Sequence, residues 1–385
     1  MEESFLLLFM VINLFSLSSP TSLVNPPLCH DEDSSALLQF RESFVTDMCA
    51  SNDTFTYPKT ESWKIDGSDC SSIGDLGSLH TFSIQNCIMS GPIPTSFGNL
   101  KKLVYLELSE NYFDSKNFSS LSWLAKKTSG EIPFYFANLT QLNTLSLHNC
   151  RITGQIPPWL AEMTALTYLD LAYNQLKGPI PGSIFQLENI QTLDLVNNKL
   201  SGIVKFDMFL KLTKLKILLL SGNNLTLLTE FHANVTGKFF VMAFASCNLN
   251  SFPHFLKDQN QLLWLDLSNN NIHGLIPEWL WNRSRDTLEY INLSDNFLVG
   301  FEQNPVVFPW SRTSFLNISH NKLRGPVPVP PPSIQIYGAK NNNLTGKFPY
   351  DLRSSSLYLL DRPKNNLNGM LPRCLGNLCF LGGLV

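Results

Sequence analysis

Charged residues are scarce in this sequence. Of its 385 residues 15% are charged, and 28 Lys and Arg stand against 31 Asp and Glu, which gives a formal net charge of −3. In globular chains about a quarter of the residues are usually charged. A near-neutral chain that is 44% hydrophobic is expected to fold, so the composition excludes a disordered protein and a generally basic nucleic-acid binder. A neutral polar surface suits an extracellular protein.

Catalytic and metal-binding motifs are also missing. The sequence contains no His-Glu-x-x-His, Gly-x-Ser-x-Gly, Cys-x-x-Cys, Gly-x-Gly-x-x-Gly or Gly-x-x-x-x-Gly-Lys-Ser/Thr. We therefore predict that the chain is not an enzyme and binds no metal and no cofactor. The seven histidines are scattered without the spacing of metal ligands: His30, His80, His148, His232, His254, His273 and His320.

Long apolar runs are limited to one, from Phe5 to Leu17, which small polar residues follow. This run is too short to span a bilayer of about 30 Å, and it ends like a cleavage region. It predicts a signal peptide over residues 1–22. Glu2 and Glu3 stand where such signals usually carry Lys or Arg, which leaves a buried first helix as the alternative. We expect secretion, and no later stretch of the sequence predicts a membrane span.

A short motif, Gly-x-Ile/Val/Phe/Leu-Pro, recurs along the chain. Gly130, Gly154, Gly178 and Gly202 are each 24 residues apart, and Gly274 follows after three times 24. A frame of Leu-x-x-Leu-x-Leu-x-x-Asn/Cys-x-Leu begins twelve residues before these glycines, except at Gly130. This periodicity is that of a leucine-rich repeat. Twelve frames start at Leu79, Leu103, Leu142, Leu166, Ile190, Leu215, Phe239, Leu262, Leu288, Thr313, Ile334 and Leu357.

The frame predicts an α/β-type solenoid, a superhelix of 24-residue repeats whose short strands form one concave parallel sheet. Positions one, four and six point inward and the positions between them point outward. Each strand ends inside the solenoid, away from water. A backbone N–H or C=O group without a hydrogen-bond partner would cost ~1–3 kcal/mol there. The Asn at position nine can donate and accept there, which predicts a buried ladder of Asn111, Asn174, Asn198, Asn223, Asn270, Asn296, Asn321, Asn342 and Asn365. The same position is occupied by core thiols in Cys87, Cys150 and Cys247.

The Gly-x-Ile-Pro segments resemble the plant-specific subclass of these repeats, in which Gly turns the chain, Ile points inward and Pro starts a short convex helix. Together with the segment from Cys29 to Phe40, they make the chain similar to plant receptor-like proteins of the disease-resistance type, as far as about Cys374. The resemblance implies an extracellular recognition domain at the plasma membrane. It also implies a separate membrane helix, signalling through partner receptor kinases, and a peptide, protein or cell-wall-derived ligand in defence or development.

Two other functions stay open. The chain could be a soluble inhibitor of a secreted cell-wall-degrading enzyme, or a nonfunctional or decoy fragment. Departures from the family pattern favour an apparently truncated member. Residues 23–76 form an incomplete cysteine-containing cap, in which Cys29 and Cys70 are the plausible disulfide and Cys49 has no obvious partner.

The repeat region itself is expected to span residues 77–373 and to be defective near 115–129. Gly91 and Gly130 are 39 residues apart where two repeats need 48, so a strand is expected to be lost between Asn117 and Ser129. Arg362 occupies an inward position of the last frame. Residues 374–385 read as the truncated start of a further repeat.

Sequons for N-glycosylation are frequent and support secretion. Two of them fall at the fifth frame position on the concave sheet. The sequence leaves open whether these two asparagines carry glycans or stay unmodified. The nine sequons begin at Asn52, Asn117, Asn138, Asn224, Asn234, Asn282, Asn292, Asn317 and Asn343.

Outward frame positions predict the ligand-binding surface. The third positions form a row rich in large apolar groups, expected to face solvent: Tyr105, Thr144, Tyr168, Thr192, Ile217, Val241, Trp264, Tyr290, Phe315 and Ile336. An outward aromatic row favours recognition, although the aromatics could instead pack only against one another. Acidic residues at position five are expected to form a solvated stripe beside it. The predicted site comprises Tyr105, Glu107, Tyr168, Asp170, Asp194, Trp264, Asp266, Tyr290 and Phe315.

Expression in a eukaryotic secretory host tests the signal and the sequons together. The mature chain should begin near residues 20 to 26 and should run several kilodaltons heavier than its polypeptide, because attached glycans add mass. Treatment with peptide-N-glycosidase should remove the difference. A cytosolic, unglycosylated product that keeps Met1 would contradict the secretory prediction.

Overall fold

A computed structural model describes most of the repeat region. The described residues are 45–46, 79–86, 89–90, 93, 95–113, 130–230, 239–280, 285–303, 307–347, 359–361, 364–368 and 383–384. The predicted Cys29–Cys70 pair, Cys49, Cys87, Arg362 and the remnant between Asn117 and Ser129 lie outside these residues.

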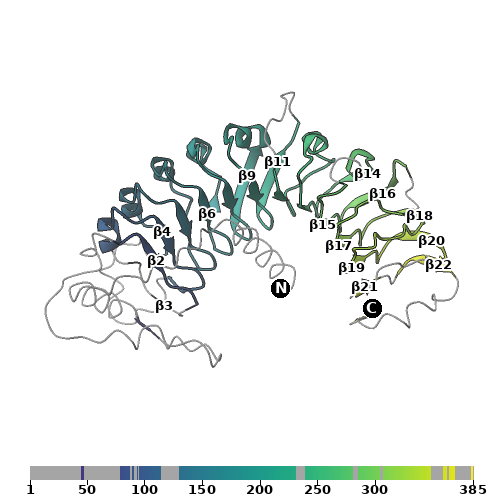
Figure 1. Cartoon of the computed structure of the whole chain (residues 1–385), viewed down its shortest axis with the longest axis horizontal. Helices are drawn as coiled ribbons and strands as arrows, with labels where there is room; N and C mark the ends of the chain where they lie inside the picture. Colours follow the sequence, from purple (N-terminus) through teal and green to yellow (C-terminus); the bar gives the residue numbers. More distant parts are fainter. Residues whose placement is uncertain are drawn as a thin grey trace.

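The described chain winds into an arc whose inner side is a thirteen-stranded parallel sheet (Figure 1). Twelve strands begin at the third position of the twelve predicted frames, which confirms the leucine-rich-repeat solenoid. In chain order the strands are β2 (Thr81–Ser83), β4 (Tyr105–Glu107), β5 (Thr144–Ser146), β6 (Tyr168–Asp170), β8 (Thr192–Asp194), β10 (Ile217–Leu219), β12 (Val241–Ala243), β13 (Trp264–Asp266), β15 (Tyr290–Asn292), β17 (Phe315–Asn317), β19 (Ile336–Gly338), β21 (Leu359–Asp361) and β23 (Gly383–Leu384).

The sheet continues without a gap across the long repeat. Tyr105 of β4 pairs directly with Thr144 of β5, and Glu107 pairs with Ser146. Tyr105 and Thr144 are thus neighbours in the sheet although they are 39 residues apart along the chain.

The turn out of each strand follows the predicted Gly-x-Ile-Pro chemistry. Gly154 and Gly178 adopt φ values of +84° and +81°, which side chains with a Cβ rarely adopt. Ile156 and Ile180 follow them into the core. Three small parallel sheets run beside these turns. They contain β7 (Lys177–Gly178), β9 (Lys199–Lys205) and β11 (Asn224–Leu228); β14 (His273–Ile276) and β16 (Phe297–Phe301); and β18 (Arg324–Pro326), β20 (Asn343–Lys347) and β22 (Asn366–Asn368). A separate antiparallel pair joins β1 (Val45–Thr46) and β3 (Met89–Ser90).

The outer side of the arc carries short 3-10 helices. Pro133, Pro157 and Pro181 are the caps that precede three of them, since proline fixes a φ that suits a helix start and has no N–H to leave unpaired. The described helices are η2 (Thr95–Asn99), η3 (Phe134–Asn138), η4 (Pro158–Glu162), η5 (Gly182–Gln186), η6 (Phe206–Lys211) and η7 (His254–Asp258).

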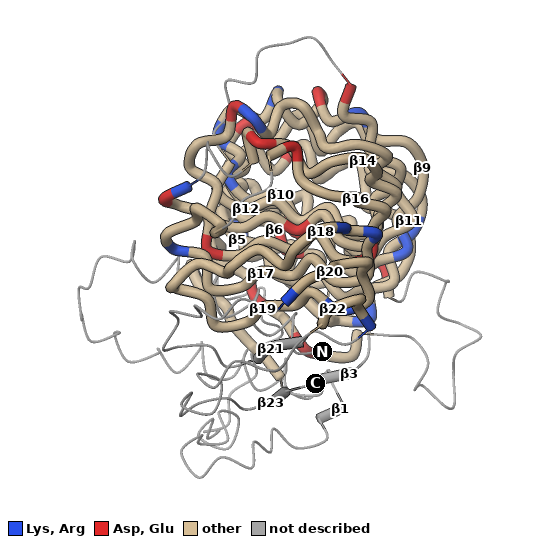
Figure 2. The backbone as a smooth tube through the Cα atoms, turned by 90° about the vertical axis from the view of Figure 1, so that its right-hand side faces the viewer, with Lys and Arg blue, Asp and Glu red and all other residues tan. Residues whose placement is uncertain are grey.

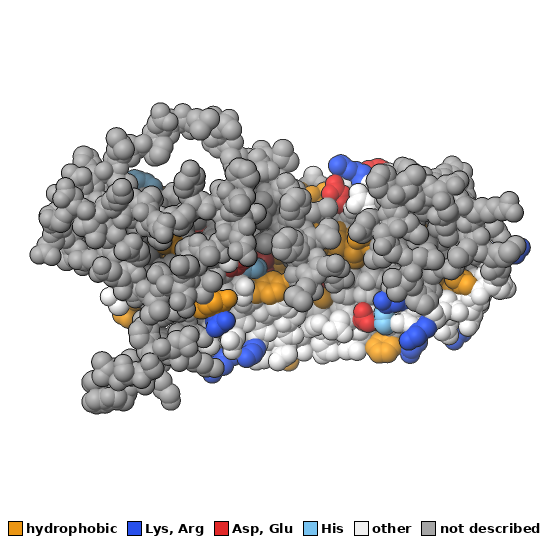
Figure 3. Space-filling model, turned by 90° about the horizontal axis from the view of Figure 1, so that it is seen from below, with side chains coloured by type: hydrophobic (Ala, Val, Ile, Leu, Met, Phe, Trp, Pro, Cys, Tyr) orange, Lys and Arg blue, Asp and Glu red, His pale blue; other side chains and the backbone are white. Residues whose placement is uncertain are grey.

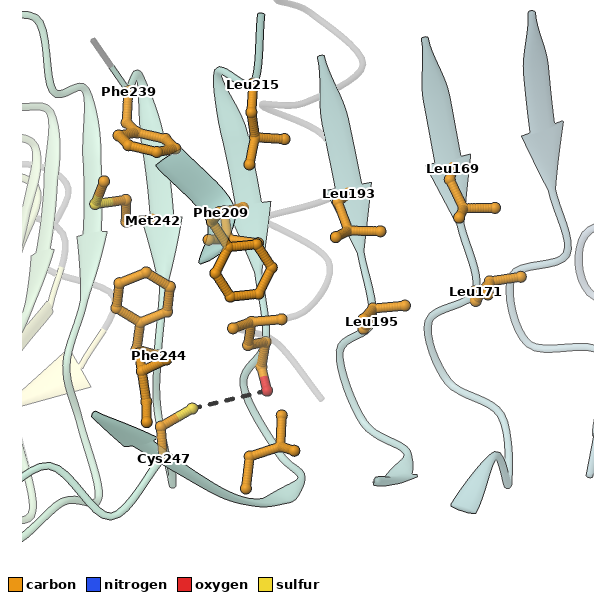
Figure 4. Packing of buried hydrophobic residues seen from close by; sticks show 14 of the residues in the cluster. Leu169, Leu171, Leu193, Leu195, Phe209, Leu215, Phe239, Met242, Phe244 and Cys247 are labelled. Carbon is orange, nitrogen blue, oxygen red and sulfur yellow. Dashed lines mark hydrogen bonds between the residues drawn. The ribbon is translucent and has the colours of Figure 1, made fainter. Parts of the chain in front are cut away.

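Inward side chains fill the space between sheet and helices with one continuous core. Leu169 and Leu171 of one repeat lie side by side with Leu193 and Leu195 of the next (Figure 4). Phe replaces Leu around Phe206, whose ring stacks on Phe255 at a centroid distance of 3.8 Å. Charged side chains are scattered along the backbone tube (Figure 2).

The predicted asparagine ladder is present, and each amide bridges two repeats. The Asn174 Nδ2 donates to the carbonyls of Leu147, Leu171 and Ala172 at 2.7 to 3.0 Å. The Asn174 Oδ1 accepts from the N–H groups of Cys150 and Ile152 at 3.1 and 2.8 Å. Equivalent bonds to the backbone are made by Asn111, Asn198, Asn223, Asn270, Asn296, Asn321, Asn342 and Asn365.

Two cysteines in this position are buried thiols, as predicted. Cys150 Sγ donates to the carbonyl of Leu108 at 2.9 Å, and Cys247 Sγ to that of Leu220 at 3.9 Å (Figure 4). Burial raises the pKa of each thiol to about 12. In both repeats the next residue, Arg151 or Asn248, takes a positive φ.

Position eight of the frame is left-handed in every described repeat. Its φ lies between 50° and 71° even where the residue is Tyr173 or Glu110, at a cost of about 1–2 kcal/mol for a residue with a Cβ. Its N–H nevertheless continues the ladder between repeats; that of Tyr173 donates to Val196 at 2.8 Å. The twelve residues are Asn86, Glu110, Asn149, Tyr173, Asn197, Gly222, Ser246, Asn269, Asp295, His320, Asn341 and Lys364.

Substituting Asn174 by alanine tests the ladder. The change leaves buried backbone groups unpaired at ~1–3 kcal/mol each, so we expect the free energy of unfolding to fall by about 2–4 kcal/mol. Urea unfolding measures the loss. The matched control is Asn271→Ala, because Asn271 is exposed and its Nδ2 bonds the exposed Asn248. An equal loss in both variants would contradict a specific role of the ladder.

Candidate functional site

The nine predicted ligand-binding residues all lie on strands of the inner sheet. The aromatic residues are first in their strands and the acidic residues third, so each group forms a row across the sheet. The structure separates them into two parts. Asp170 and Asp194 are paired residues of β6 and β8, whereas Trp264, Tyr290 and Phe315 lie on β13, β15 and β17.

The aromatic part is a continuous stack. Trp264 and Tyr290 lie 3.4 Å apart between ring centroids with planes 5° apart, and Tyr290 and Phe315 lie 4.2 Å apart with planes 11° apart. Neighbouring strands are about 4.8 Å apart, so equal side-chain directions bring the rings face to face. The three residues are 4%, 2% and 8% exposed. The prediction that this row faces solvent is therefore wrong for them.

Aliphatic residues connect the two parts. Ile217, Leu219 and Val241 of β10 and β12 are buried and belong to the same hydrophobic cluster as the aromatic stack. This second cluster lies on the opposite face of the sheet from the leucine core, because its members occupy the outward frame positions. The inner face thus carries an apolar surface of its own.

The acidic part surrounds His148. Its Nδ1 lies 3.5 Å from Asp170 Oδ2, and Tyr168 donates from its hydroxyl to the same oxygen at 3.4 Å. Tyr105 similarly donates to Glu107. Asp170 is 3% exposed, which corrects the prediction of a solvated acidic stripe, whereas Asp194 and Asp266 are partly exposed.

Each carboxylate also ends its own strand. Asp170 Oδ1 accepts from the N–H of Ala172 at 2.9 Å, and Asp194 Oδ1 accepts from the N–H of Val196 at 3.0 Å. Asp266 accepts from Ser268 in the same way at 2.9 Å. The fifth frame position therefore has a structural task as well as an outward direction, since it satisfies an N–H where the strand stops.

Electrostatics couple these groups. Burial, followed by the charge of Asp170, raises the pKa of Asp194 well above its usual range, against the hydrogen bond from Val196. Burial opposes the charging of His148, but the hydrogen bond and charge of Asp170, with Asp194 and Glu110, outweigh it and raise the pKa of His148. A basic or hydroxyl-bearing ligand group is suited to this part.

His148 was not predicted as a member of the site. It occupies the seventh frame position, one residue beyond the last inward leucine, and its ring lies 5.0 Å from that of Tyr173. The signal in the sequence was a histidine at a position where most other repeats carry Ser, Ala or Val. Seen from below, the visible surface shows histidine beside acidic side chains, with hydrophobic side chains nearby (Figure 3).

The sequon asparagines fall into two groups. Asn138, Asn224 and Asn343 are exposed on η3, β11 and β20, whereas Asn292 is 1% exposed and Asn317 partly buried on the inner sheet. Asn52, Asn117, Asn234 and Asn282 lie outside the described residues. In the described part of the chain, no helix has the length and hydrophobicity needed to cross a membrane.

Comparison with known proteins places the repeats in a family context. Models of the leucine-rich repeat match residues 140–200 and 261–282. Receptor-like protein 7 of Arabidopsis thaliana is 39% identical over 160 residues, which are 41% of this chain and 16% of the relative. Receptor-like protein 54 of the same plant is 38% identical over 171 residues, which are 44% of this chain and 21% of the relative. The matched regions thus span about a fifth or less of these relatives.

Solved structures with a similar fold include ectodomains of plant receptors. The crystal structure of PEPR1-AtPEP1 has a TM-score of 0.62 at 26% identity, covering 83% of this chain and 43% of that one. The leucine-rich-repeat ectodomain of the Arabidopsis thaliana receptor kinase GASSHO1/SCHENGEN3, in complex with CASPARIAN STRIP INTEGRITY FACTOR 2, has a TM-score of 0.56 at 26% identity, covering 80% and 41%. The chain therefore carries leucine-rich repeats of the kind found in plant receptor-like proteins.

Substituting Asp194 by asparagine tests the electrostatic coupling. Folding raises the pKa of Asp194, so above about pH 4 the folded chain binds more protons than the unfolded chain. The free energy of unfolding therefore falls as pH rises toward neutrality. Protonated His148 adds stability with the same sign, present at low pH and lost as pH rises through its raised pKa. Asp194→Asn should flatten the decline and be more stable than the parent by on the order of 1 kcal/mol at neutral pH.

Urea unfolding at several pH values measures this effect, with Asp207→Asn as control. Asp207 is an exposed carboxylate in the first turn of η6, so its neutralisation should leave the pH dependence in place. An unchanged slope in Asp194→Asn would show that Asp194 is not coupled as described.

Proposed function

We propose that this chain is part of the extracellular recognition domain of a plant receptor-like protein, and that its inner sheet binds a peptide or protein ligand. Both solved ectodomains named above are complexes, one of PEPR1 with AtPEP1 and one with CASPARIAN STRIP INTEGRITY FACTOR 2. The similarity to receptor-like proteins supports a location at the cell surface and signalling, in defence or development, through partner receptor kinases.

The observation that carries the proposal is the pairing of two unlike chemistries on one sheet. The carboxylates of Asp170 and Asp194 lie at one end of the apolar cluster, and the stack that begins with Trp264 lies at the other. From β8 to β13 there are three strand steps of about 4.8 Å, or roughly 14 Å. An extended peptide covers about 3.4 Å per residue. A ligand of this surface would therefore carry a basic group about four residues from an apolar one.

The indole of Trp264 places a hydrogen-bond donor, its Nε1–H, in the apolar end of the surface. Among the described residues, none accepts a hydrogen bond from the buried Trp264 Nε1. A buried donor without an acceptor costs about 1–3 kcal/mol. A backbone carbonyl of a bound peptide would remove this cost only if side chains of the inner sheet move, because the nitrogen itself is buried.

A selection from a random peptide library tests the proposal without knowledge of the natural ligand. Peptides selected on the purified chain should bind Tyr168→Ala and Trp264→Ala about 5- to 150-fold more weakly, the equivalent of ~1–3 kcal/mol. Their sequences should contain Lys or Arg and an aromatic or aliphatic residue at a constant separation.

The matched control removes an indole from the other side of the solenoid. Trp159 lies in η4 and is partly buried against the leucine core. Trp159→Ala should retain peptide affinity, and circular dichroism should show that all three variants are folded. Equal affinity of the parent, Tyr168→Ala and Trp264→Ala for the selected peptides would exclude the inner sheet as the binding surface.

A further inference from the structure

The sequons of this chain occur at two different positions of the repeat frame. Asn292-Leu-Ser294 and Asn317-Ile-Ser319 begin at position five, on the inner sheet, whereas Asn224-Leu-Thr226 and Asn343-Leu-Thr345 begin at position ten, on the small sheets. In each case the middle residue is an inward leucine or isoleucine. The sequon is therefore partly a product of the repeat pattern, and its presence alone does not identify a sugar attachment site.

At position five the asparagine amide and the hydroxyl are both packed. Asn292 and Ser294 are 1% and 4% exposed. Asn292 Oδ1 accepts from the N–H of Ser294 at 3.1 Å, the same contact that Asp170 and Asp194 make in their repeats. Asn292 is also flanked by its strand partners Asp266 and Asn317, which lie about 4.8 Å away on either side.

Asn317 is packed against a glycine of the next strand. Its Oδ1 accepts from the N–H of Ser319 at 3.1 Å. Gly338 is its strand partner, and a Cβ added at Gly338 would lie 2.5 Å from that same Oδ1. The amide thus occupies the space that a side chain at position 338 would take, and Ser319 is 2% exposed. A sugar on Nδ2 would have to displace this packing.

At position ten the asparagine side chains are exposed instead of packed. Asn224 and Asn343 begin β11 and β20, at the side of the arc (Figure 1), and both are exposed. Thr345 is exposed as well, and Thr226 is partly exposed. Asn138 and Thr140 are exposed at the end of η3. All three asparagines are exposed, so a sugar can be attached to them from the solvent side.

We propose that Asn138, Asn224 and Asn343 carry N-linked glycans and that Asn292 and Asn317 do not, their sequons serving to end strands of the inner sheet. The inference rests on passage of the chain through the secretory pathway, which belongs to the proposed function. In the transfer, Asn Nδ2 forms a bond to C1 of a sugar, the sugar–phosphate bond of a lipid-linked oligosaccharide diphosphate breaks, and Nδ2 gives up one proton as the lipid diphosphate leaves.

Sugar transfer precedes complete folding, so the packing of the folded sheet does not prevent the reaction. It decides instead which of the modified chains can fold. The Asn292 side chain is 1% exposed between its strand partners Asp266 and Asn317, so the closed sheet leaves no room for a sugar on its Nδ2. A chain modified there would not close the inner sheet and would be retained rather than secreted. Of the sequons in the described part of the chain, those that carry carbohydrate in the secreted protein would therefore lie on the side and the outer surface. The inner sheet, with its aromatic stack and acidic residues, would be free of sugar.

Glycopeptide mass spectrometry of the full chain, secreted from plant cells, tests the proposal. We expect occupied Asn138, Asn224 and Asn343 and unmodified Asn292 and Asn317. Glycans on Asn292 or Asn317 in secreted, folded protein would overturn it, as would missing glycans on Asn224 and Asn343. If the sugar-free chain is nevertheless in the medium, only the glycan assignment fails. If it stays in the cytosol with Met1 retained, the proposed secretory route fails as well.

Substitutions in the third sequon residue separate the sugar from the asparagine. Thr345→Ala should lower the mass of the secreted protein by one glycan, and Ser294→Ala should leave it unchanged. Asn292→Asp removes the sequon but keeps the acceptor for Ser294, so it should be secreted like the parent. Asn292→Ala removes the acceptor and should be secreted less. Equal secretion of these two variants would overturn the structural role of Asn292.

Discussion

The structure depends on hydrogen bonding of the peptide groups where each strand ends. The chain must leave the sheet inside the solenoid, away from water, and the position-nine asparagine supplies both a donor and an acceptor there. Because Asn174 bonds Leu147 and Cys150 of the preceding repeat as well as its own turn, the same amide that closes a turn also fixes the distance between repeats. The left-handed residue at position eight follows from this geometry, since it carries the strand ladder one residue further while the chain turns.

Much of the fold could be predicted from the sequence because the inward positions repeat with a fixed phase. The frame gives the start of each strand, the glycine turns and the asparagine ladder. It does not give the helix type on the outer side, which is 3-10 in η2 to η7, since five or six residues leave little room for a longer helix.

The candidate site was predictable in its position but not in its environment. The frame states on which side of the sheet a residue leaves the backbone, so Trp264 and Asp170 were placed on the correct face. Burial of outward residues depends on neighbouring strands: Trp264 is covered by an equivalent ring on β15, and Asp170 by Tyr168 and His148. The Trp264–Tyr290 and His148–Asp170 contacts join residues about one repeat apart, and no single frame contains them. The N-terminal cap, the Cys29–Cys70 pair and Arg362 remain predictions.

The direct pairing of Tyr105 with Thr144 has a consequence for how proteins of this kind can diverge. A strand finds its place in the sheet by its frame and not by its distance along the chain, so segments between frames can lengthen or shorten while the order of side chains on the inner face stays the same. Connecting segments and recognition surface are then separate targets of mutation. A lineage can change its outer contour by insertion and deletion and its ligand by substitution, and neither process interrupts the other.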